Sequence, residues 1–340
     1  LGPLEEFPLL EMPTPEAIRD GQKTLREVGA IDAKNQLTEM GKQVAVLVEV
    51  KARFDEQRNV ELAQRLEKAG VHVVYGIVGL KTHTKLAVVV REEQDGLRTY
   101  AHIGTGNYNS STATLYVDLG LFTCDPAITG DVIELFHYLT GRSMKSDYNK
   151  LLIAPVTMRS RFVQMIDQEI EHARAGRTAR IVAKMNALQD EKIILKLYEA
   201  SSAGVKIDLI IRGFCSLLPG VPGMSENIRV VSILGRFLEH ARVYRFHNDG
   251  ADEFYLGSAD WMSRNLDWRV EAITPVENKS IRATLAQILD INLNDQSTAW
   301  ELGSNGTWTR RASDTETQGT QEKLMQFVAG ARGVPSDIKP

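Results

Sequence analysis

Residues 83 to 107 read HTKLAVVVREEQDGLRTYAHIGTGN, and residues 240 to 260 read HARVYRFHNDGADEFYLGSAD. Both stretches begin with a histidine that is followed two residues later by a cation and then by a strand pattern. Both end in a Gly-hydroxyl-x-amide or acid turn, which the histidine precedes by 21 residues in the first stretch and by 17 in the second. Two copies in the same order indicate an internal duplication, in which each half contributes one imidazole and one positive charge to a shared cleft.

These side chains are suited to phosphoryl transfer. A neutral imidazole can attack phosphorus, and a second imidazole can manage the proton on the leaving oxygen. Lys85 and Arg242, the cations of the two stretches, can neutralise phosphate oxygens. We therefore predict that His83, His240 and Lys85 are catalytic. We expect structural or surface roles for the other histidines, which are His72, His102, His137, His172 and His247.

Alternating strands and helices are predicted for the first half of the chain. Val44 to Val50 is a nearly continuous β-branched run, Asn59 to Ala69 has apolar residues at helical spacing, and Val71 to Tyr75 begins another strand. This order is typical of a parallel βαβ unit. Further predicted elements are strands over Leu86–Val90 and Arg98–Ile103, joined by Asp95-Gly96 as a hairpin turn, and a helix over Asp131–Leu139.

The second half repeats this plan. Asp190 can cap a helix that runs to Ser202, and Gly204 precedes the next strand. Trp300 and Trp308 flank a Gly-Ser-Asn-Gly hairpin, and we expect their indoles to pair across the strands. The other predicted strands are 151–154, 180–184, 205–211, 228–233, 243–246, 254–256 and 270–275, and the other predicted helices are 159–175 and 280–291.

Length and composition limit the class of protein. A chain of 340 residues favours two domains of roughly 150 residues each, and 43% hydrophobic with 25% charged residues is typical of an α/β protein. The net charge of -4 argues against a nucleic-acid partner. With two distant cysteines, no apolar run of about 18 residues and no signal pattern, we expect a cytoplasmic protein without an integral membrane segment. The first residue is Leu1, so we expect a fragment of a longer protein.

The sequence offers side-chain cations for binding phosphate. It has no Gly-x-x-x-x-Gly-Lys-Ser/Thr loop and no metal-ligand spacing such as Cys-x-x-Cys. Arg53 and Arg212 each follow a predicted buried strand, 30 and 28 residues before their histidines. Ligands of open α/β sheets bind beyond the carboxyl ends of the strands, so we expect these two arginines to face each other across a cleft. The further candidates are Lys51, Lys81, Lys85, Arg236, Arg242, Arg264 and Arg269.

Several runs resemble a known family. Residues 46–56, 75–85 and 102–109 are similar to the polyphosphate kinases of the phospholipase D-like fold. The resemblance continues through 119–123, 138–141, 212–213, 237–242 and 267–269, and it covers about residues 41 to 310, the two C-terminal catalytic domains of that family. It implies an α/β fold of two phospholipase D-like domains related by internal duplication, with mixed sheets flanked by helices. We expect the first domain over 1–150, with an atypical lead-in over 1–40, the second over 151–310, and a polar tail over 311–340.

The resemblance also implies roles for individual residues. His83 matches the phosphohistidine of the family and His240 its second catalytic histidine, while Arg53 matches an arginine that seats phosphate and Mg²⁺. Residues 1–40 depart from the family pattern, so Arg26 is only a weak candidate for the other phosphate- and metal-associated arginine. The expected contacts to the nucleotide are Tyr116, Arg212, His240, Arg242 and Arg269. The family's two N-terminal domains, one for nucleotide binding and one for dimer contacts, have no counterpart here, which leaves ATP affinity and a homo-oligomer open.

Three functions are compatible with these residues. The leading one is reversible transfer of the terminal phosphate of ATP, with Mg²⁺, to inorganic polyphosphate through phospho-His83, with ADP as the other product. The second is a phospholipase D-like phosphodiesterase or nuclease, whose usual signature has an acid five residues after the lysine; that position is Val90 here, and Arg242 replaces the second lysine. The third is a non-catalytic fragment that only binds polyphosphate or ATP.

Overall fold

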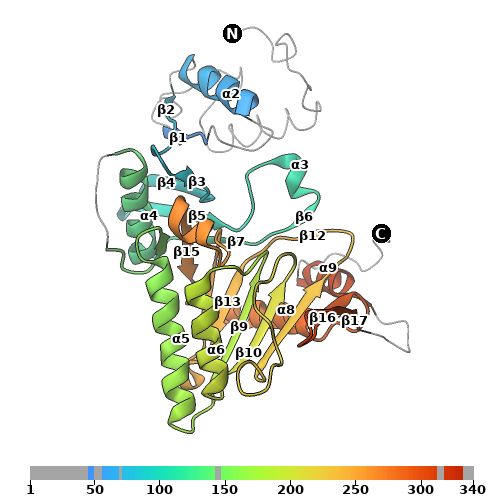
Figure 1. Ribbon diagram of the computed structural model, residues 1–340. Coiled ribbons are helices and arrows are strands. Elements are labelled where there is room, and N and C mark those ends of the chain that lie inside the picture. Colours follow the sequence, from blue (N-terminus) through green and yellow to red (C-terminus); the bar gives the residue numbers. More distant parts are fainter. Residues whose placement is uncertain (1–44, 50–55, 69–70, 142–146, 312–317, 332–340) are drawn as a thin grey trace. The chain divides into compact units, whose positions relative to one another are not determined.

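The computed structural model describes residues 45–49, 56–68, 71–141, 147–311 and 318–331 (Figure 1). The chain divides into two compact units, Leu1–Val78 and Gly79–Pro340, and each is described by itself. Arg26, Arg53 and the atypical lead-in over 1–40 lie outside the described residues. The domain boundary at 150/151 stays a prediction.

The described residues of the first unit form a strand-helix-strand motif. The strands β1 (Ala45–Leu47) and β2 (His72–Val74) are parallel, and α2 (Glu56–Lys68) lies between them in the sequence. Parallel neighbours need a crossover connection of this kind. The predicted βαβ unit is therefore confirmed.

The second unit is built on a ten-stranded mixed sheet. Its strands are β3 (Lys81–Thr82), β8 (Leu152–Ala154), β9 (Arg180–Met185), β10 (Lys206–Ile211), β11 (Ile228–Ile233), β13 (Val243–Phe246), β14 (Glu253–Gly257), β15 (Arg269–Pro275), β16 (Ala299–Leu302) and β17 (Trp308–Arg310). Their order is β17-β16-β11-β10-β9-β13-β14-β15-β3, and β8 also pairs with β15. The central β9, β10 and β11 are parallel, and antiparallel strands follow on both sides.

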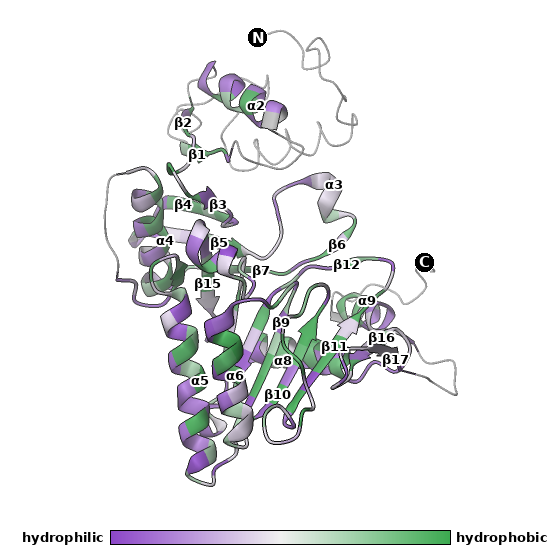
Figure 2. Ribbon diagram, viewed as in Figure 1, coloured by the Kyte–Doolittle hydropathy of each residue, from purple (hydrophilic) through white to green (hydrophobic). Residues whose placement is uncertain are grey.

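Helices cover both faces of this sheet. On one face, α5 (Met158–Arg174) and α6 (Glu191–Ser202) bury apolar residues such as Phe162 against the strands. On the other face, α8 (Lys279–Leu293) contributes Leu285 and Leu289 to a second core. Figure 2 shows hydrophobic residues concentrated along β10 and β11, with hydrophilic residues on the exposed parts of α5. As predicted, Asp190 caps α6 by accepting from the backbone N–H of Ile193 at 3.1 Å.

A three-stranded antiparallel sheet lies between β3 and β8 in the sequence. It consists of β4 (Leu86–Glu93), β5 (Gly96–Gly104) and β7 (Gly120–Thr123), and α4 (Pro126–Leu139) follows it. Glu93 pairs with Gly96, so the hairpin turn consists of residues 94 and 95. The predicted turn, Asp95-Gly96, was one residue too late because Gly96 already pairs in β5. The helix α4 also begins earlier than predicted, because Asp125 caps it.

Two very short parallel pairings connect residues 79–141 with residues 147–311. The strand β3 pairs with the start of β15, and β6 (Tyr116–Val117) pairs with β12 (Leu238–Glu239). His83 directly follows β3, and His240 directly follows β12. These pairings, which the sequence did not predict, position both histidines.

The C-terminal region differs from the prediction in the register of its hairpin. Trp300 lies opposite Arg310 and Trp308 opposite Leu302, so the predicted pairing of the indoles is wrong. Leu302 and Trp308 close a five-residue loop, 303–307, and this register places Arg310 opposite Trp300. The predicted polar tail contains a helix, α9 (Thr320–Ala331).

The remaining short helices are α3 (Ser110–Ala113), the 3₁₀ turn η3 (Asn248–Gly250) and α7 (Ser263–Trp268). Within the described ranges, no helix combines the length and the apolar character needed to cross a bilayer.

Candidate active site

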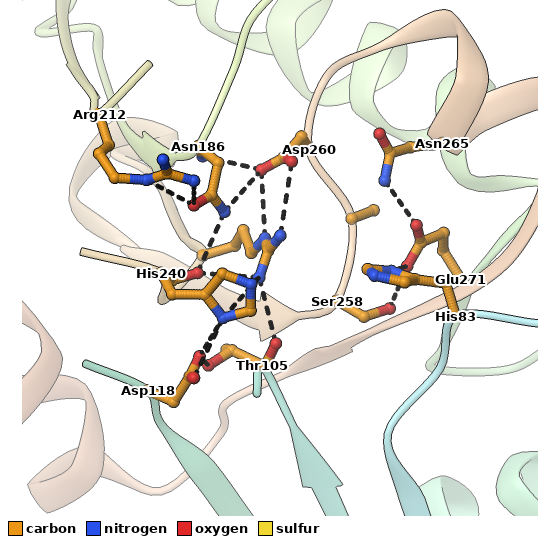
Figure 3. A network of polar contacts seen from close by, with 12 residues as sticks. His83, Thr105, Asp118, Asn186, Arg212, His240, Ser258, Asp260, Asn265 and Glu271 are labelled. Carbon is orange, nitrogen blue, oxygen red and sulfur yellow. Dashed lines mark hydrogen bonds and ion pairs between the residues drawn. The ribbon is translucent and has the colours of Figure 1, made fainter. Parts of the chain in front are cut away.

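His83 is held by groups from the opposite half of the second unit (Figure 3). Its Nδ1 lies 2.9 Å from Oε2 of Glu271, and its backbone N–H donates to the carbonyl of Val270 at 2.9 Å. Glu271 is fully buried, and the hydroxyl of Ser258 donates to the same Oε2 at 2.5 Å. Because Nδ1 faces this carboxylate, Nε2 is the ring nitrogen left for chemistry.

His240 is held in the same way. Its Nδ1 lies 2.8 Å from Oδ1 of Asp118, and its backbone N–H donates to the carbonyl of Val117 at 3.2 Å. The hydroxyl of Thr105 donates to Oδ1 of Asp118 at 2.6 Å. The same three kinds of contact therefore orient both imidazoles.

The two acids occupy equivalent positions in the sequence. Asp118 follows Thr105 by 13 residues, and Glu271 follows Ser258 by 13 residues. Each acid accepts from the hydroxyl of its own half and holds the histidine of the other half (Figure 3). The structure thus brings both predicted histidine-turn stretches into one crossed arrangement.

The two cations next to the histidines also have equivalent contacts. The ammonium of Lys85 donates to the carbonyl of His83, and Nη1 of Arg242 donates to the carbonyl of His240 at 2.9 Å. Nη1 of Arg242 also lies 3.1 and 3.3 Å from the two ring nitrogens of His240, so it lies over the face of the ring. Both cations are buried, and Arg242 forms an ion pair with Asp260 at 3.1 Å.

Burial and neighbouring charges keep both histidines neutral. Burial is the largest cause that lowers the pKa of His83, to about 4, and the charge of Lys85 lowers this pKa further, against the effect of Glu271. Burial likewise lowers the pKa of Lys85 to about 7. The pKa of His240 is lowered by burial first, with the hydrogen bond to Asp118 acting in the opposite direction. A neutral imidazole is the form that can attack phosphorus or accept a proton.

Arg212 joins the network through an amide. Its Nη2 donates to Oδ1 of Asn186 at 2.6 Å, and the amide of Asn186 donates to Asp260 and to the carbonyl of His240, both at 3.2 Å. Arg212 is therefore close to His240, at the carboxyl end of β10. The expected pairing with Arg53 across a cleft concerns a residue outside the described part of the chain.

Tyr116 and Arg269 stand at the start of the two strands that hold the histidines. The ring of Tyr116 in β6 lies against the ring of His240, with 4.9 Å between centroids. Nη1 of Arg269 in β15 lies 3.8 Å from Oε1 of Glu271, the partner of His83. The structure thus places both predicted nucleotide contacts beside a histidine of the site.

Sequence reasoning missed both acids and the amide of Asn186. The equal spacing of 13 residues from Thr105 to Asp118 and from Ser258 to Glu271 was a signal that could have found the acids. No comparable spacing marks Asn186. Three of the other histidines bond to partners outside this network: His102 to Tyr108, His172 to Asn248 and His247 to Asp252.

The described part of the site does not form a metal cage. Among the described residues, no group of three His, Cys, Asp or Glu side chains could hold a metal ion. The two acids of the site are already bonded to a histidine and a hydroxyl. A divalent ion would therefore have to bring most of its ligands with it, as Mg²⁺ does when it is bound to phosphates and water.

Two family models match this chain. One, described as polyphosphate kinase C-terminal domain 1, matches residues 24–145. The other, described as polyphosphate kinase C-terminal domain 2, matches residues 151–322.

Similar proteins agree with these matches. Polyphosphate kinase from Thermosynechococcus vestitus is 59% identical over 297 residues, and that from Streptomyces coelicolor is 51% identical over 306 residues. These alignments cover 87% and 89% of this chain but 41% of each relative. The crystal structure of polyphosphate kinase from Porphyromonas gingivalis matches with a TM-score of 0.79 and 37% identity, over 86% of this chain and 45% of that chain. The chain thus spans less than half the length of these relatives.

Proposed function

This chain belongs to the polyphosphate kinase family, and we propose that it transfers the terminal phosphate of ATP reversibly to inorganic polyphosphate through a phosphate bound covalently to His83. The observation that carries this proposal is the crossed pair of histidines. In each histidine the Nδ1 atom faces a carboxylate, so that the Nε2 atom is left to react.

The transfer takes two in-line steps. In the first, the Nε2 lone pair of His83 attacks the terminal phosphorus of ATP, the bond from phosphorus to the bridging oxygen breaks, and ADP leaves with the electron pair. The ring keeps its proton on Nδ1, and the carboxylate of Glu271 at 2.9 Å balances the positive charge that the ring acquires. In the second step, a terminal oxygen of polyphosphate attacks the phosphorus and the bond to Nε2 breaks. Two displacements let one nucleophile serve a nucleotide and a polymer.

The remaining groups manage charge and protons. His240, neutral and held by Asp118, can pass a proton to or from the leaving or attacking oxygen. Arg242 is buried and bonded to Asp260. Its positive charge therefore acts on the site through the ring of His240, which it lies against. Arg212 and Arg269 are partly exposed and are the better candidates for direct contact with phosphate oxygens.

Magnesium enters this proposal together with the nucleotide. Bound to ATP, Mg²⁺ would supply positive charge to the phosphate oxygens. Arg53 and, more weakly, Arg26 are the positions that we expect beside this ion and its phosphates. We also propose a cytoplasmic location, because Cys124 and Cys215 are both free thiols.

The test is to incubate the chain with γ-labelled ATP and Mg²⁺. We expect an acid-labile, base-stable label on the protein and growth of labelled polyphosphate, and His83→Ala should abolish both. His247→Ala is a matched control, because His247 also bonds to an acid, Asp252, outside the network. A histidine label that persists in His83→Ala would contradict the assignment. Binding of ATP or polyphosphate without any label would favour a binding fragment, and cleavage of a phosphodiester would favour a phosphodiesterase.

A further inference from the structure

The two histidine-acid pairs differ in how the acid is held. Glu271 receives a hydrogen bond on each oxygen: Ser258 donates to Oε2, and Nδ2 of Asn265 donates to Oε1 at 2.5 Å. Asn265 lies in α7 and is fully buried. Its side chain points toward the carboxylate that holds His83 (Figure 3).

Asp118 lacks such an amide partner within the described part of the chain. Its hydrogen bonds come from Thr105 and from the ring of His240. Its side chain is 23% exposed, whereas that of Glu271 is 0% exposed. Glu271 is therefore held by more hydrogen-bond donors and is shut off from water, whereas Asp118 is held by fewer groups and is open to water.

We propose that Asn265 is a positioning residue, which fixes Glu271 so that the proton of His83 stays on Nδ1 and the lone pair of Nε2 is kept for phosphorus. The proposal rests on the proposed function of His83 as the nucleophile. It also gives a reason why the two histidines differ: His83 is restricted to one tautomer, while His240 can gain and lose a proton.

The physical argument concerns the charge of Glu271. Hydrogen bonds donated to both oxygens of a carboxylate favour its ionised form, because protonation would turn one of the accepting oxygens into a donor. The anion attracts the N–H of His83 and repels the lone pair of the other tautomer. Without Asn265, the buried carboxylate would take up a proton more easily, because burial penalises its charge. The histidine would then lose the group that selects its tautomer.

The first measurement needs no nucleotide. Nitrogen-15 NMR of histidine-labelled protein distinguishes the two imidazole tautomers, and the His83 signals are identified by their loss in His83→Gln. We expect the Nδ1–H tautomer in the wild-type chain near neutral pH and a mixture of tautomers in Asn265→Leu. The second measurement is the pH dependence of phosphohistidine formation. Losing one hydrogen bond to a charged group should move the acid limb upward by about one to two pH units.

The chain offers a matched control. Asn292 is also fully buried, and its Nδ2 donates one hydrogen bond to the carbonyl of Ile288. The Oδ1 atoms of Asn292 and Asn265 both lack a hydrogen-bond partner. Asn292→Leu should change stability without changing the His83 tautomer or the acid limb. If Asn265→Leu does not fold, Asn265→Asp keeps the shape and places a second carboxyl against Glu271. Because two adjacent carboxyls share a proton, the acid limb should again move upward.

The outcomes separate the two proposals. An unchanged tautomer and an unchanged acid limb in folded Asn265 variants would overturn the role of Asn265. If the wild-type chain forms no phosphohistidine, the proposed function fails, and the tautomer measurement still decides whether Asn265 acts on His83.

Discussion

Lys85 is the basis of a prediction about the pH dependence of the site. Burial lowers its pKa to about 7, whereas that of His83 is lowered to about 4. His83 is thus neutral above about pH 4, and Lys85 is charged below about pH 7. We predict that kcat/KM for ATP falls as the pH rises through about 7, because the free enzyme then loses the charge of Lys85, which we propose neutralises phosphate oxygens.

Bound phosphate should stabilise the charged form of Lys85. The alkaline limb of kcat should therefore lie at a higher pH than that of kcat/KM, since kcat reports on the enzyme with substrate bound. The measurement is a pair of pH profiles between about pH 5 and 9. A kcat/KM profile that stays level through this range would contradict the role of Lys85.

His240 allows a second prediction at the scale of one residue. We expect His240→Ala to lower the rate of polyphosphate synthesis by about 10²- to 10⁴-fold, the usual contribution of general acid-base catalysis. The fold should persist, because the ring is held by a partly exposed acid and not by a core. Rate measurements with a thermal melt check this, and His247→Ala should keep the wild-type rate. Loss of the folded state in His240→Ala would instead indicate a structural role.

At the scale of elements, α9 contacts β12, the strand that His240 directly follows. The side chain of Gln321 accepts from the backbone N–H of Phe237 at 2.9 Å and donates to the carbonyl of the same residue at 2.7 Å. Its amide also donates to Glu239 in β12 at 3.0 Å. Gln321 thus bonds the backbone as a neighbouring strand would, one residue before β12 begins.

We predict that Gln321→Ala slows polyphosphate synthesis by about tenfold, which corresponds to about 1.4 kcal/mol, the scale of one or two lost hydrogen bonds. The effect should act through His240, so both labelling of His83 by ATP and transfer to the polymer should slow. Both half-reactions can be followed with labelled ATP. Gln326→Ala, at an exposed position of the same helix, is the control. Equal rates in the two variants would show that α9 does not position β12.

At the scale of the whole molecule, the crossed pairings hold the second unit together. The pairs β3–β15 and β6–β12 join residues 79–141 to residues 147–311, and the bonds from Glu271 to His83 and from Asp118 to His240 follow the same crossing. We predict that a chain cut once between residues 141 and 147 stays associated and still forms phosphohistidine. Native electrophoresis and labelling after cleavage of an inserted protease site test this. Separation of the two pieces under native conditions would contradict it.

The sequence alone determined the parts of this protein that depend on local patterns. The alternation of β-branched runs and amphipathic segments predicted β9, β10 and β11, and the capping position of Asp190 predicted the start of α6, because a strand or cap needs only its own residues. The repeated histidine-cation-turn order indicated both histidines of the site and the phosphoryl transfer that we propose for them, and the runs around them indicated the family.

Only the tertiary structure decided which groups meet. The strands β3, β6 and β12 are two residues long, too short to show any periodicity, and their partners lie far away in the sequence. The crossing of Glu271 to His83 and of Asp118 to His240 follows from those pairings. The offset of Trp300 from Trp308 likewise depends on a register that a loop of five residues sets. Such contacts form between distant segments, and no local pattern of residues specifies them because their free energy depends on the packing of the whole unit.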